Sequence, residues 1–400
     1  MSPEVDISIA NTQSEIVSAP GPATWEPPQL PPRSRRLWGV PLAVLGLGIG
    51  TTFMVGSMFY VDRYAEAPGS ADGVNDRLAV SAVPLYKSKG EILFVTVAGP
   101  RLTGVQAAIG WLDPDVREDT YIERFGQRTP DQDRQVNLRA MRSAKNDAPY
   151  VALTKLGYPT KRLPGPVVIE FVYCKEVAPD NEGCSVSFPA DAFLDAGDQF
   201  VAVDGVKIER YEDLDNVMKD KKPGDKVSVT VRRATAADDQ TETGVVELAE
   251  GGDEDPNRAI FGIQLGDTTQ VELPFAVDIA TDQIGGPSAG LAFTLSVLDE
   301  LTPGELTGGK KVAVTGTIDV DGNVGPIGGL HQKAVAVRNA GADIFIVPAD
   351  QTPTQLDRAR RILGADKVFP VATVDEALDV LANQGGNALE IGTPGEGYTA

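Results

Sequence analysis

Two kinds of apolar segment alternate after residue 256, and this alternation constrains the fold more than any other feature of the chain. Strands that alternate with helices predict an α/β sheet covered by helices. The short apolar runs, typical of buried strands, are at 311–315 and 344–347. The segments with helical spacing of apolar residues are at 289–301, 330–340, 355–363 and 374–381.

Residues 37–61 contain no charged side chain. About 20 such residues span the hydrocarbon core of a bilayer, so the stretch predicts one transmembrane helix. Arg33, Arg35 and Arg36 precede it, and this excess of positive charge predicts a cytoplasmic N-terminus. We therefore expect a single-pass protein of the cell membrane, with everything after residue 62 outside the cytoplasm.

A cleaved signal peptide is the competing interpretation of this stretch. The sequence Ala65-Glu66-Ala67 resembles a cleavage site. However, the apolar stretch is longer than the roughly 7–15 residues of a signal peptide core. In addition, Pro68 lies where cleavage is disfavoured. We favour an uncleaved anchor.

The composition excludes several classes of function. The chain has 36 Lys and Arg against 57 Asp and Glu, a net charge of −21, which repels phosphate backbones and argues against nucleic-acid partners. Two Cys and one His leave little for a Cys/His metal site, so no metal and no cofactor is predicted. A Ser-His-Asp triad could use only His331, which we expect to be a solvated surface residue, so a hydrolase would need another base.

The two cysteines, Cys174 and Cys184, lie on the predicted outer side of the membrane. A disulfide is expected in an oxidising compartment and would contribute roughly 3 kcal/mol by closing this short loop. Two buried free thiols are the alternative.

Composition divides the chain into six segments. Pro- and Ser-rich sequence precedes the apolar stretch, and a polar, Gly-containing linker at 250–256 separates two folded regions. We predict a disordered cytoplasmic tail (1–36), a transmembrane helix (37–61), a linker and N-terminal extracytoplasmic segment (62–165), a β-rich domain (166–250), an α/β domain (251–385) and a flexible tail (386–400). Within 62–165, we expect a strand at 91–97 and helices at 104–112 and 132–141.

The first candidate for chemistry is Ser288, in the segment Gly285-Gly286-Pro287-Ser288-Ala289-Gly290. This segment leads into an apolar helix, so backbone N–H groups and the positive end of the helix dipole could stabilise a developing oxyanion. An ordinary helix-capping serine after a Gly-Pro turn is the alternative.

The second candidate is Lys333, in the first turn of the helix that follows Gly328-Gly329. A lysine there could act as a base if its amine were neutral. Lowering its pKa from about 10.4 to about 7 takes about 4.6 kcal/mol. A helix terminus supplies only about 0.3–1 kcal/mol, so burial must supply most of the shift. A surface lysine on an amphipathic helix is the alternative.

Taken together, three segments resemble the proteolytic domain of the Lon family of serine peptidases over residues 265–385. They are GGPSAGLAF at 285–293, VTGTI at 314–318 and GPIGGLHQK at 325–333. The resemblance implies Ser288 as nucleophile, Lys333 as general base and Thr315 as a supporting hydroxyl that hydrogen-bonds the lysine amine. It also implies the α/β (α+β) fold of that domain, protein or peptide substrates, and a homo-oligomer, a hexamer by family resemblance.

The sequence departs from the ATP-dependent members of that family. Gly285 and Thr317 stand where acidic residues are often found, which fits the membrane-anchored, PDZ-containing branch better. The segment Gly304-x4-Gly309-Lys310 is only a near match to a P-loop, because Lys311 replaces the Ser or Thr that binds Mg²⁺. We therefore expect proteolysis without ATP.

The middle segment resembles a PDZ domain. The resemblance is carried by Pro189-Ala190, Gly197-Asp198 and Val203-Asp204-Gly205, and it places the groove helix at 211–221. The Gly-Φ-Gly-Φ loop expected before the second strand is reduced to Gly165-Pro166-Val167-Val168. Peptide binding and a structural or gating role are therefore alternatives for this small β-rich domain.

Two functions follow from the sequence. The first is an ATP-independent serine endopeptidase with a Ser288–Lys333 dyad that acts at the extracytoplasmic face of the membrane. The alternative is a membrane-tethered PDZ scaffold with an inactive protease-like domain.

Overall fold

The computed structural model describes residues 36–178, 183–233, 240–252, 255–266 and 268–387. The predicted disordered tail (1–36) lies outside these residues except for Arg36, and the predicted flexible tail (386–400) lies outside them from residue 388. The chain divides into two compact units, 1–55 and 56–400, which are described separately.

The first unit contains most of helix α1 (Arg36–Met58). The predicted transmembrane span at 37–61 is not supported. Among the described residues, no helix has both the length and the apolar character that a bilayer crossing requires. The helix also ends before the predicted span does, because Tyr60 begins strand β1 (Tyr60–Gly73) and pairs with Thr103.

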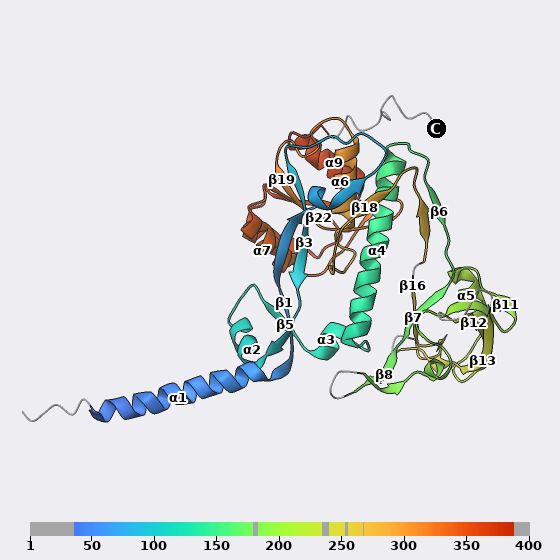
Figure 1. Ribbon diagram of the computed structural model, residues 1–400, viewed down its shortest axis with the longest axis horizontal. Helices are drawn as coiled ribbons and strands as arrows, with labels where there is room; N and C mark the ends of the chain where they lie inside the picture. The colour runs from blue at the N-terminus through green and yellow to red at the C-terminus, as the bar shows by residue number, and fades with distance from the viewer. Residues whose placement is uncertain (1–35, 179–182, 234–239, 253–254, 267, 388–400) are drawn as a thin grey trace, which may run out of the picture. The chain divides into compact units, whose positions relative to one another are not determined.

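A seven-stranded sheet organises the second unit (Figure 1). Its order is β23-β22-β19-β3-β1-β4, with β5 also paired to β1. The contacts among β3, β19, β22 and β23 are parallel, whereas β1 pairs antiparallel with β3, β4 and β5. The other strands span Glu91–Ala98 (β3), Arg101–Thr103 (β4), Arg117–Asp119 (β5), Lys311–Val314 (β19), Ile344–Pro348 (β22) and Val368–Val371 (β23). Strands from the N-terminal segment thus share one sheet with strands from the C-terminal segment.

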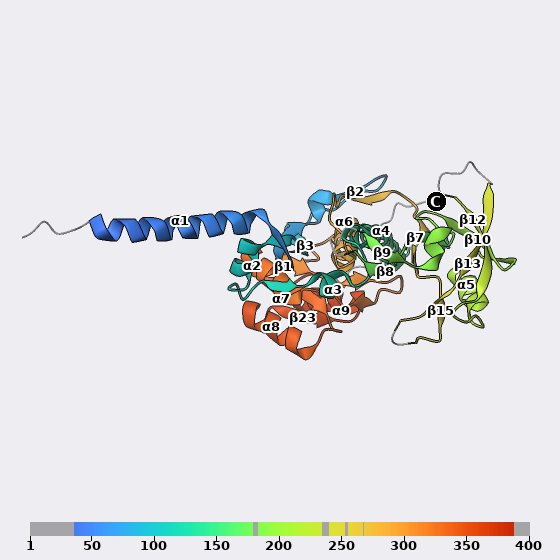
Figure 2. The same cartoon turned by 90° about the horizontal axis from the view of Figure 1, so that it is seen from below.

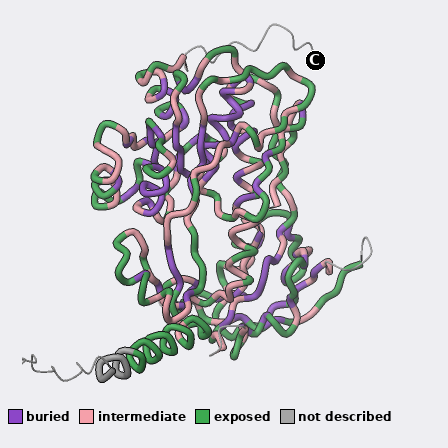
Figure 3. Tube along the Cα trace, turned by 60° about the vertical axis from the view of Figure 1, so that its left-hand side comes forward, coloured by how far each residue is buried: buried purple, intermediate pink, exposed green. Residues whose placement is uncertain are grey.

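Helices cover both faces of this sheet, as the alternation of apolar side chains requires. On β3, Ile92 and Phe94 face one hydrophobic core, and Leu93 and Val95 face the other. Helices α4, α6 and α9 pack on the first face, and α7 and α8 pack on the second (Figure 1). Buried chain concentrates along these strands in Figure 3. The C-terminal helices are α6 (Gly290–Leu301), α7 (Leu330–Ala340), α8 (Pro353–Leu363) and α9 (Val374–Asn383), which confirms the four predicted helices.

Helix α4 (Pro130–Lys155) is much longer than the predicted helix at 132–141. Thr129 and Gln132 form a capping box at its start, and Pro130 occupies the first turn, where proline is tolerated. The helix continues through Pro149, because Ala148, Val151 and neighbouring residues are buried in the core against α6. Tertiary packing therefore outweighs the helix-breaking tendency of proline. The predicted helix at 104–112 is α2 (Gly104–Gly110), and α3 covers Tyr121–Phe125.

The middle of the chain forms a second, six-stranded sheet of order β13-β12-β10-β7-β16, with β11 paired to β10. Figure 2 shows β10, β12 and β13 side by side. The bounds are Val168–Val172 (β7), Gln199–Val203 (β10), Val206–Lys207 (β11), Lys226–Arg232 (β12), Thr241–Glu247 (β13), Ile263–Gly266 (β16) and Tyr211–Met218 (α5). The sheet therefore includes a strand from beyond residue 250.

Short elements complete the second unit. Two-stranded antiparallel pairs are β2 (Leu78–Val80) with β18 (Val277–Ile279), β6 (Lys161–Leu163) with β17 (Gln270–Glu272), β14 (Ala249–Glu250) with β15 (Ala259–Ile260), and β20 (Thr317–Ile318) with β21 (Val324–Gly325). Single 3₁₀ turns occupy Asn75–Arg77 and Pro189–Ala192.

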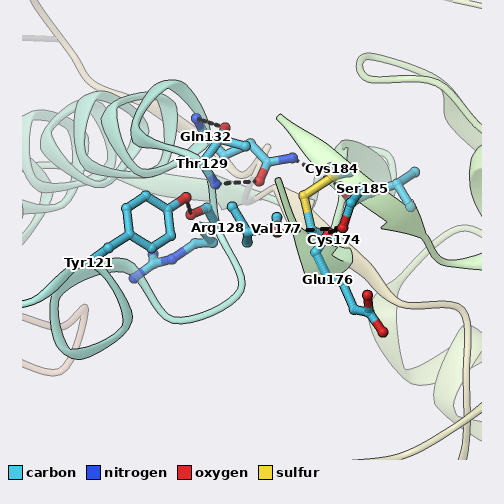
Figure 4. The surroundings of a disulfide bond; sticks show 10 residues. Tyr121, Arg128, Thr129, Gln132, Cys174, Glu176, Val177, Cys184 and Ser185 are labelled. Atoms are coloured by element: carbon cyan, nitrogen blue, oxygen red, sulfur yellow. Dashed lines mark hydrogen bonds between the residues drawn. A yellow bond between two sulfur atoms is a disulfide. The ribbon is translucent and has the colours of Figure 1, made fainter. Parts of the chain in front are cut away.

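The hairpin of β8 (Cys174–Val177) and β9 (Cys184–Ser187) is closed by a disulfide between Cys174 and Cys184 (Figure 4). This confirms the favoured prediction for the two cysteines. Val177 of the hairpin packs against an aromatic cluster that contains Tyr64 and Tyr121. The cross-linked hairpin thereby packs against residues of β1 and α3.

Asp299, on α6, provides a test of the core. Its side chain is 2% exposed, and its Oδ1 accepts a hydrogen bond of 3.2 Å from the backbone N–H of Leu306. Burial raises the pKa of Asp299 to about 6, with a smaller upward contribution from Glu305. The favourable contribution of the protonated carboxyl is therefore present below the unfolded-state pKa and is lost as the pH rises through about 6.

We predict that Asp299→Asn raises the free energy of unfolding at pH 8 by about 1–3 kcal/mol and changes it little at pH 4. The neutral amide retains an acceptor for Leu306 and removes the cost of ionising a buried carboxyl. Urea unfolding at both pH values measures the effect, with exposed Asp350→Asn as control. Equal effects of Asp299→Asn at both pH values would contradict the prediction.

Candidate active site

Ser288 lies in the loop that leads into α6, two residues before the helix begins. The loop is fixed from two sides. The backbone N–H of Gly286 donates to the carbonyl of Asn137 on α4 at 2.7 Å, and the N–H of Gly316 donates to the carbonyl of Ser288 at 2.8 Å. Gly286 has φ +92°, a conformation that residues with a Cβ rarely adopt. The loop therefore holds a half-buried serine next to the N-terminus of an apolar helix.

Lys333 lies in the first turn of α7, on the opposite face of the sheet from α6. The helix begins after Gly329, which has φ +67°. A Cβ on Gly329 would lie 2.7 Å from Cγ1 of Val97 and 3.0 Å from Oε1 of Glu66. Glycine at this position lets the start of α7 approach β3 closely, and the Lys333 side chain enters the interior at this point.

Thr315 follows the last residue of β19 and connects the two sides of the site. Its N–H donates to the carbonyl of Ile346, and its hydroxyl donates to the carbonyl of Ser288 at 3.2 Å. The amine nitrogen of Lys333 lies 2.8 Å from Oγ1 of Thr315 and 2.7 Å from Oγ of Ser288. All three residues predicted from the sequence are thus brought together at the carboxyl end of a parallel strand, where open α/β sheets place their sites.

The environment of Lys333 favours a neutral amine. Its side chain is 2% exposed, and burial lowers its pKa to about 7. The carboxylate of Glu66 acts in the opposite direction and raises this pKa. Loss of hydration of the charged amine has the largest effect on this pKa, as expected from the small contribution of a helix terminus.

A cleft of about 590 Å³ gives access to this arrangement. Ser288 and Lys333 lie in its wall together with Val95, Thr96 and Val97 of β3. The pairing of β3 with β19 ends at Phe94, so beyond that residue the pairing described for β3 is with β1 alone. One edge of β3 is therefore open beside the two polar side chains.

Sequence reasoning missed two residues of this cleft, Glu66 and Asn137. Glu66 is on β1, 8% exposed, and its carboxylate lies 3.5 Å from Arg117. Neither residue occurs in a recognisable motif. The pairing of β1 with β3 and the packing of α4 beside α6 bring them to the site.

The structure also tests sequence features that were set aside. The near match to a P-loop ends in strand β19 rather than in the helix that such a loop requires. Asp319 accepts hydrogen bonds from the backbone N–H groups of Asp321 and Asn323 within the tight β20–β21 hairpin. His331 is 3.1 Å from Asp115 through Nε2, away from the Ser288 cleft.

Comparison with known proteins agrees with the site. Residues 277–384 match the family described as the Lon protease (S16) C-terminal proteolytic domain, and residues 185–248 match the PDZ domain family. The C-terminal α/β region is thus of Lon proteolytic type. The matches support a serine peptidase preceded by a PDZ-like β domain.

Similar curated proteins are Lon proteases. That of Lachnoclostridium phytofermentans is 37% identical over 93 residues, which are 23% of this chain and 11% of the relative. That of Rickettsia bellii is 28% identical over 121 residues, 30% of this chain and 15% of the relative. The chain thus spans a small part of the relatives it matches. A solved PDZ domain of an SdrC-like protein from Listeria monocytogenes is 22% identical, with a TM-score of 0.19, and covers 26% of this chain and 88% of its own.

A second cavity, of about 540 Å³, lies in the PDZ-like domain between α5 and residues 257–265. Leu214 and Met218 of α5 line one side, and Phe261-Gly262-Ile263 line the other. Strand β16 is an edge strand of its sheet and pairs only with β7 among the described strands. We expected the glycine-containing groove loop before the second strand, at residues 165–168, but the strand beside α5 is β16, which comes from the end of the domain.

The pKa of Lys333 predicts the pH dependence of any reaction that uses its neutral amine. We expect kcat/KM for peptide hydrolysis to rise with pH through about 7. Glu66→Gln removes the carboxylate that raises this pKa, so the rise should move to lower pH. The exposed substitution Glu176→Gln serves as control. A profile that stays in place or moves to higher pH in Glu66→Gln would contradict this assignment.

Proposed function

We propose that this chain is an ATP-independent serine endopeptidase in which Ser288 is the nucleophile and Lys333 the general base. The observation that carries the proposal is the contact of the Lys333 amine with two hydroxyls, at 2.7 and 2.8 Å, in an environment where burial lowers its pKa to about 7. ATP independence is supported by the absence of a P-loop helix after Lys310.

The geometry supports the following sequence of steps. The neutral amine of Lys333 accepts the proton of Ser288 as Oγ attacks the peptide carbonyl. Backbone N–H groups at or next to Ser288, just before α6 begins, stabilise the oxyanion. Lys333 then protonates the leaving amine, and water hydrolyses the acyl-enzyme with the same lysine as base. Thr315 orients the lysine, because its hydroxyl accepts from the amine and donates to the carbonyl of Ser288.

The substrate would bind as an extended strand. The open edge of β3 at residues 95–97 lines the cleft beside Ser288 and offers backbone hydrogen-bonding groups. Main-chain recognition of this kind suits an endopeptidase that cleaves unfolded polypeptides of varied sequence.

The PDZ-like domain would recruit polypeptides through the groove beside α5. An extended peptide can add to the free edge of β16, and Met218 and Ile263 present apolar surface to its side chains.

The extracytoplasmic location is part of this proposal. It is supported by the Cys174–Cys184 disulfide, since such bonds persist in oxidising compartments. The hexameric assembly and the membrane association expected from the sequence remain predictions.

Ser288→Ala and Lys333→Met should each lower hydrolysis of unfolded casein by at least about 10³-fold, because each removes a partner of the proton transfer. Methionine fills the space of the lysine chain, so the thermal midpoint should change little. Ser296→Ala, on α6 and fully buried, is the matched control and should retain activity. Full activity in either dyad variant would refute the mechanism.

A fluorophosphonate probe distinguishes the peptidase from the alternative scaffold with an inactive protease-like domain. Covalent labelling of Ser288, lost in Lys333→Met, supports the peptidase. Absence of labelling in folded, assembled protein across pH 6–9 favours the scaffold.

For the PDZ-like groove, we predict that Met218→Glu weakens binding of a fluorescent apolar peptide by about tenfold or more, because it introduces a charge into the apolar wall. Asn216→Glu, on the same helix but outside this cavity, is the control. Fluorescence anisotropy measures both affinities, and equal weakening by the two substitutions would argue against the groove.

A further inference from the structure

A third cavity, of about 670 Å³, lies on the other side of Glu66 from the Ser288 cleft. Glu66 lines both cavities. Gly328 lines the cleft, and the next residue, Gly329, lines the third cavity. A polypeptide held in one cavity is therefore close to the other.

Basic side chains dominate the lining of this cavity, although the chain as a whole has a net charge of −21. Four arginines line it: Arg117, Arg338, Arg358 and Arg361. Arg117 and Arg338 are paired internally, with Asp119 at 2.9 Å and Asp115 at 3.6 Å respectively. These carboxylates and Glu66 largely offset the charges of the first two arginines.

Two arginines remain available for a ligand. Arg358 and Arg361 are exposed, lie three residues apart on α8, and form no ion pair with any residue that the structure describes. Residues at this spacing project from the same side of a helix. Two adjacent guanidinium groups bind carboxylates in a geometry that single ammonium groups do not provide.

Polar atoms at the inner end of the cavity also lack partners. Gln332 is 5% exposed, lines the cavity, and has no hydrogen bond to its side-chain amide within the described ranges. Nδ1 of His331 is buried and likewise unpartnered among the described atoms. An amide in the cavity wall that is free of protein partners can bond to a ligand or to water. An amide both donates and accepts, which matches a peptide backbone.

We infer that this cavity is a binding site for an acidic polypeptide segment, with Arg358 and Arg361 holding its carboxylates and the Gln332 amide its backbone. This inference rests on the proposed peptidase function, because it assigns to substrates an acidic stretch next to the cleaved region. The volume favours a peptide over a small inorganic anion, which would fill only a fraction of it.

Binding without turnover tests the site. In the full-length Ser288→Ala protein, a fluorescein-labelled peptide with four consecutive Glu in a Gly/Ser sequence should bind, and the same peptide with Gln should bind at least about fivefold more weakly. Adding Arg358→Gln and Arg361→Gln should reduce affinity for the Glu peptide to that of the Gln peptide and remove its salt dependence. Arg360→Gln should change neither, because Arg360 lies between them on α8, pairs with Asp357 and does not line the cavity.

Equal affinity for the two peptides, or equal behaviour of the double variant and Arg360→Gln, would overturn the inference. So would a double variant that alters the sedimentation coefficient while it leaves peptide binding intact, since the cavity would then be occupied by a second copy of the chain. Because Ser288→Ala cannot turn over substrate, these outcomes do not depend on the dyad. Failure of the peptidase proposal would appear instead as missing hydrolysis by the parent protein.

Discussion

The site depends on one unfavourable arrangement, the burial of a lysine amine in the interior of an α/β sheet. A cationic amine with 2% exposure would lose its hydration, and no carboxylate in the described part of the chain lies within ion-pair distance of Lys333 to replace it. Loss of the proton relieves this penalty, so burial lowers the pKa of the amine to about 7, as the proposed role of a base requires. The neighbouring hydroxyls of Ser288 and Thr315 then give the amine polar partners without restoring its charge.

Each face of the sheet carries one of the two residues of this arrangement. Helix α6, on one face, positions the serine loop, and α7, on the other, carries the lysine. The side chains of Ser288 and Lys333 meet where β19 ends and the chain continues into Thr315. Since β19 lies between β3 and β22 in a parallel array, the position of Thr315 is fixed by the sheet register. The dyad geometry is thus a property of the packed sheet rather than of either glycine-rich segment.

Helix α4 links this site to the PDZ-like domain. Asn137 accepts the N–H of Gly286 near Ser288, and Gln132 donates to the carbonyl of Val172 on β7 at 3.0 Å. Arg139 lies 3.3 Å from the buried carboxylate of Glu170, also on β7. One helix therefore contacts both the serine loop and the sheet of the PDZ-like domain.

The sequence predicted those parts of the structure that depend on local pattern. Apolar periodicity located α6 to α9 and the strands between them, and the spacing of glycines around Ser288 and Lys333 indicated the dyad residues. It did not reveal Glu66, because its proximity to Lys333 depends on the pairing of β1 with β3. The sequence pattern also predicted α4 to be too short, because its continuation through Pro149 is stabilised by packing in the core. Strand β16 was not predicted, because it joins its sheet from outside the expected domain limits. The apolar composition of residues 37–61 suggested a membrane span, but Tyr60 and Val61 at the end of this stretch belong to strand β1.

The most direct test of this account is titration of the Lys333 amine by NMR, with Lys333→Met used to assign its signal. The account predicts a midpoint near pH 7, set by burial. An amine that stays cationic up to pH 10 in the folded protein would contradict it, because Ser288 would then have no base.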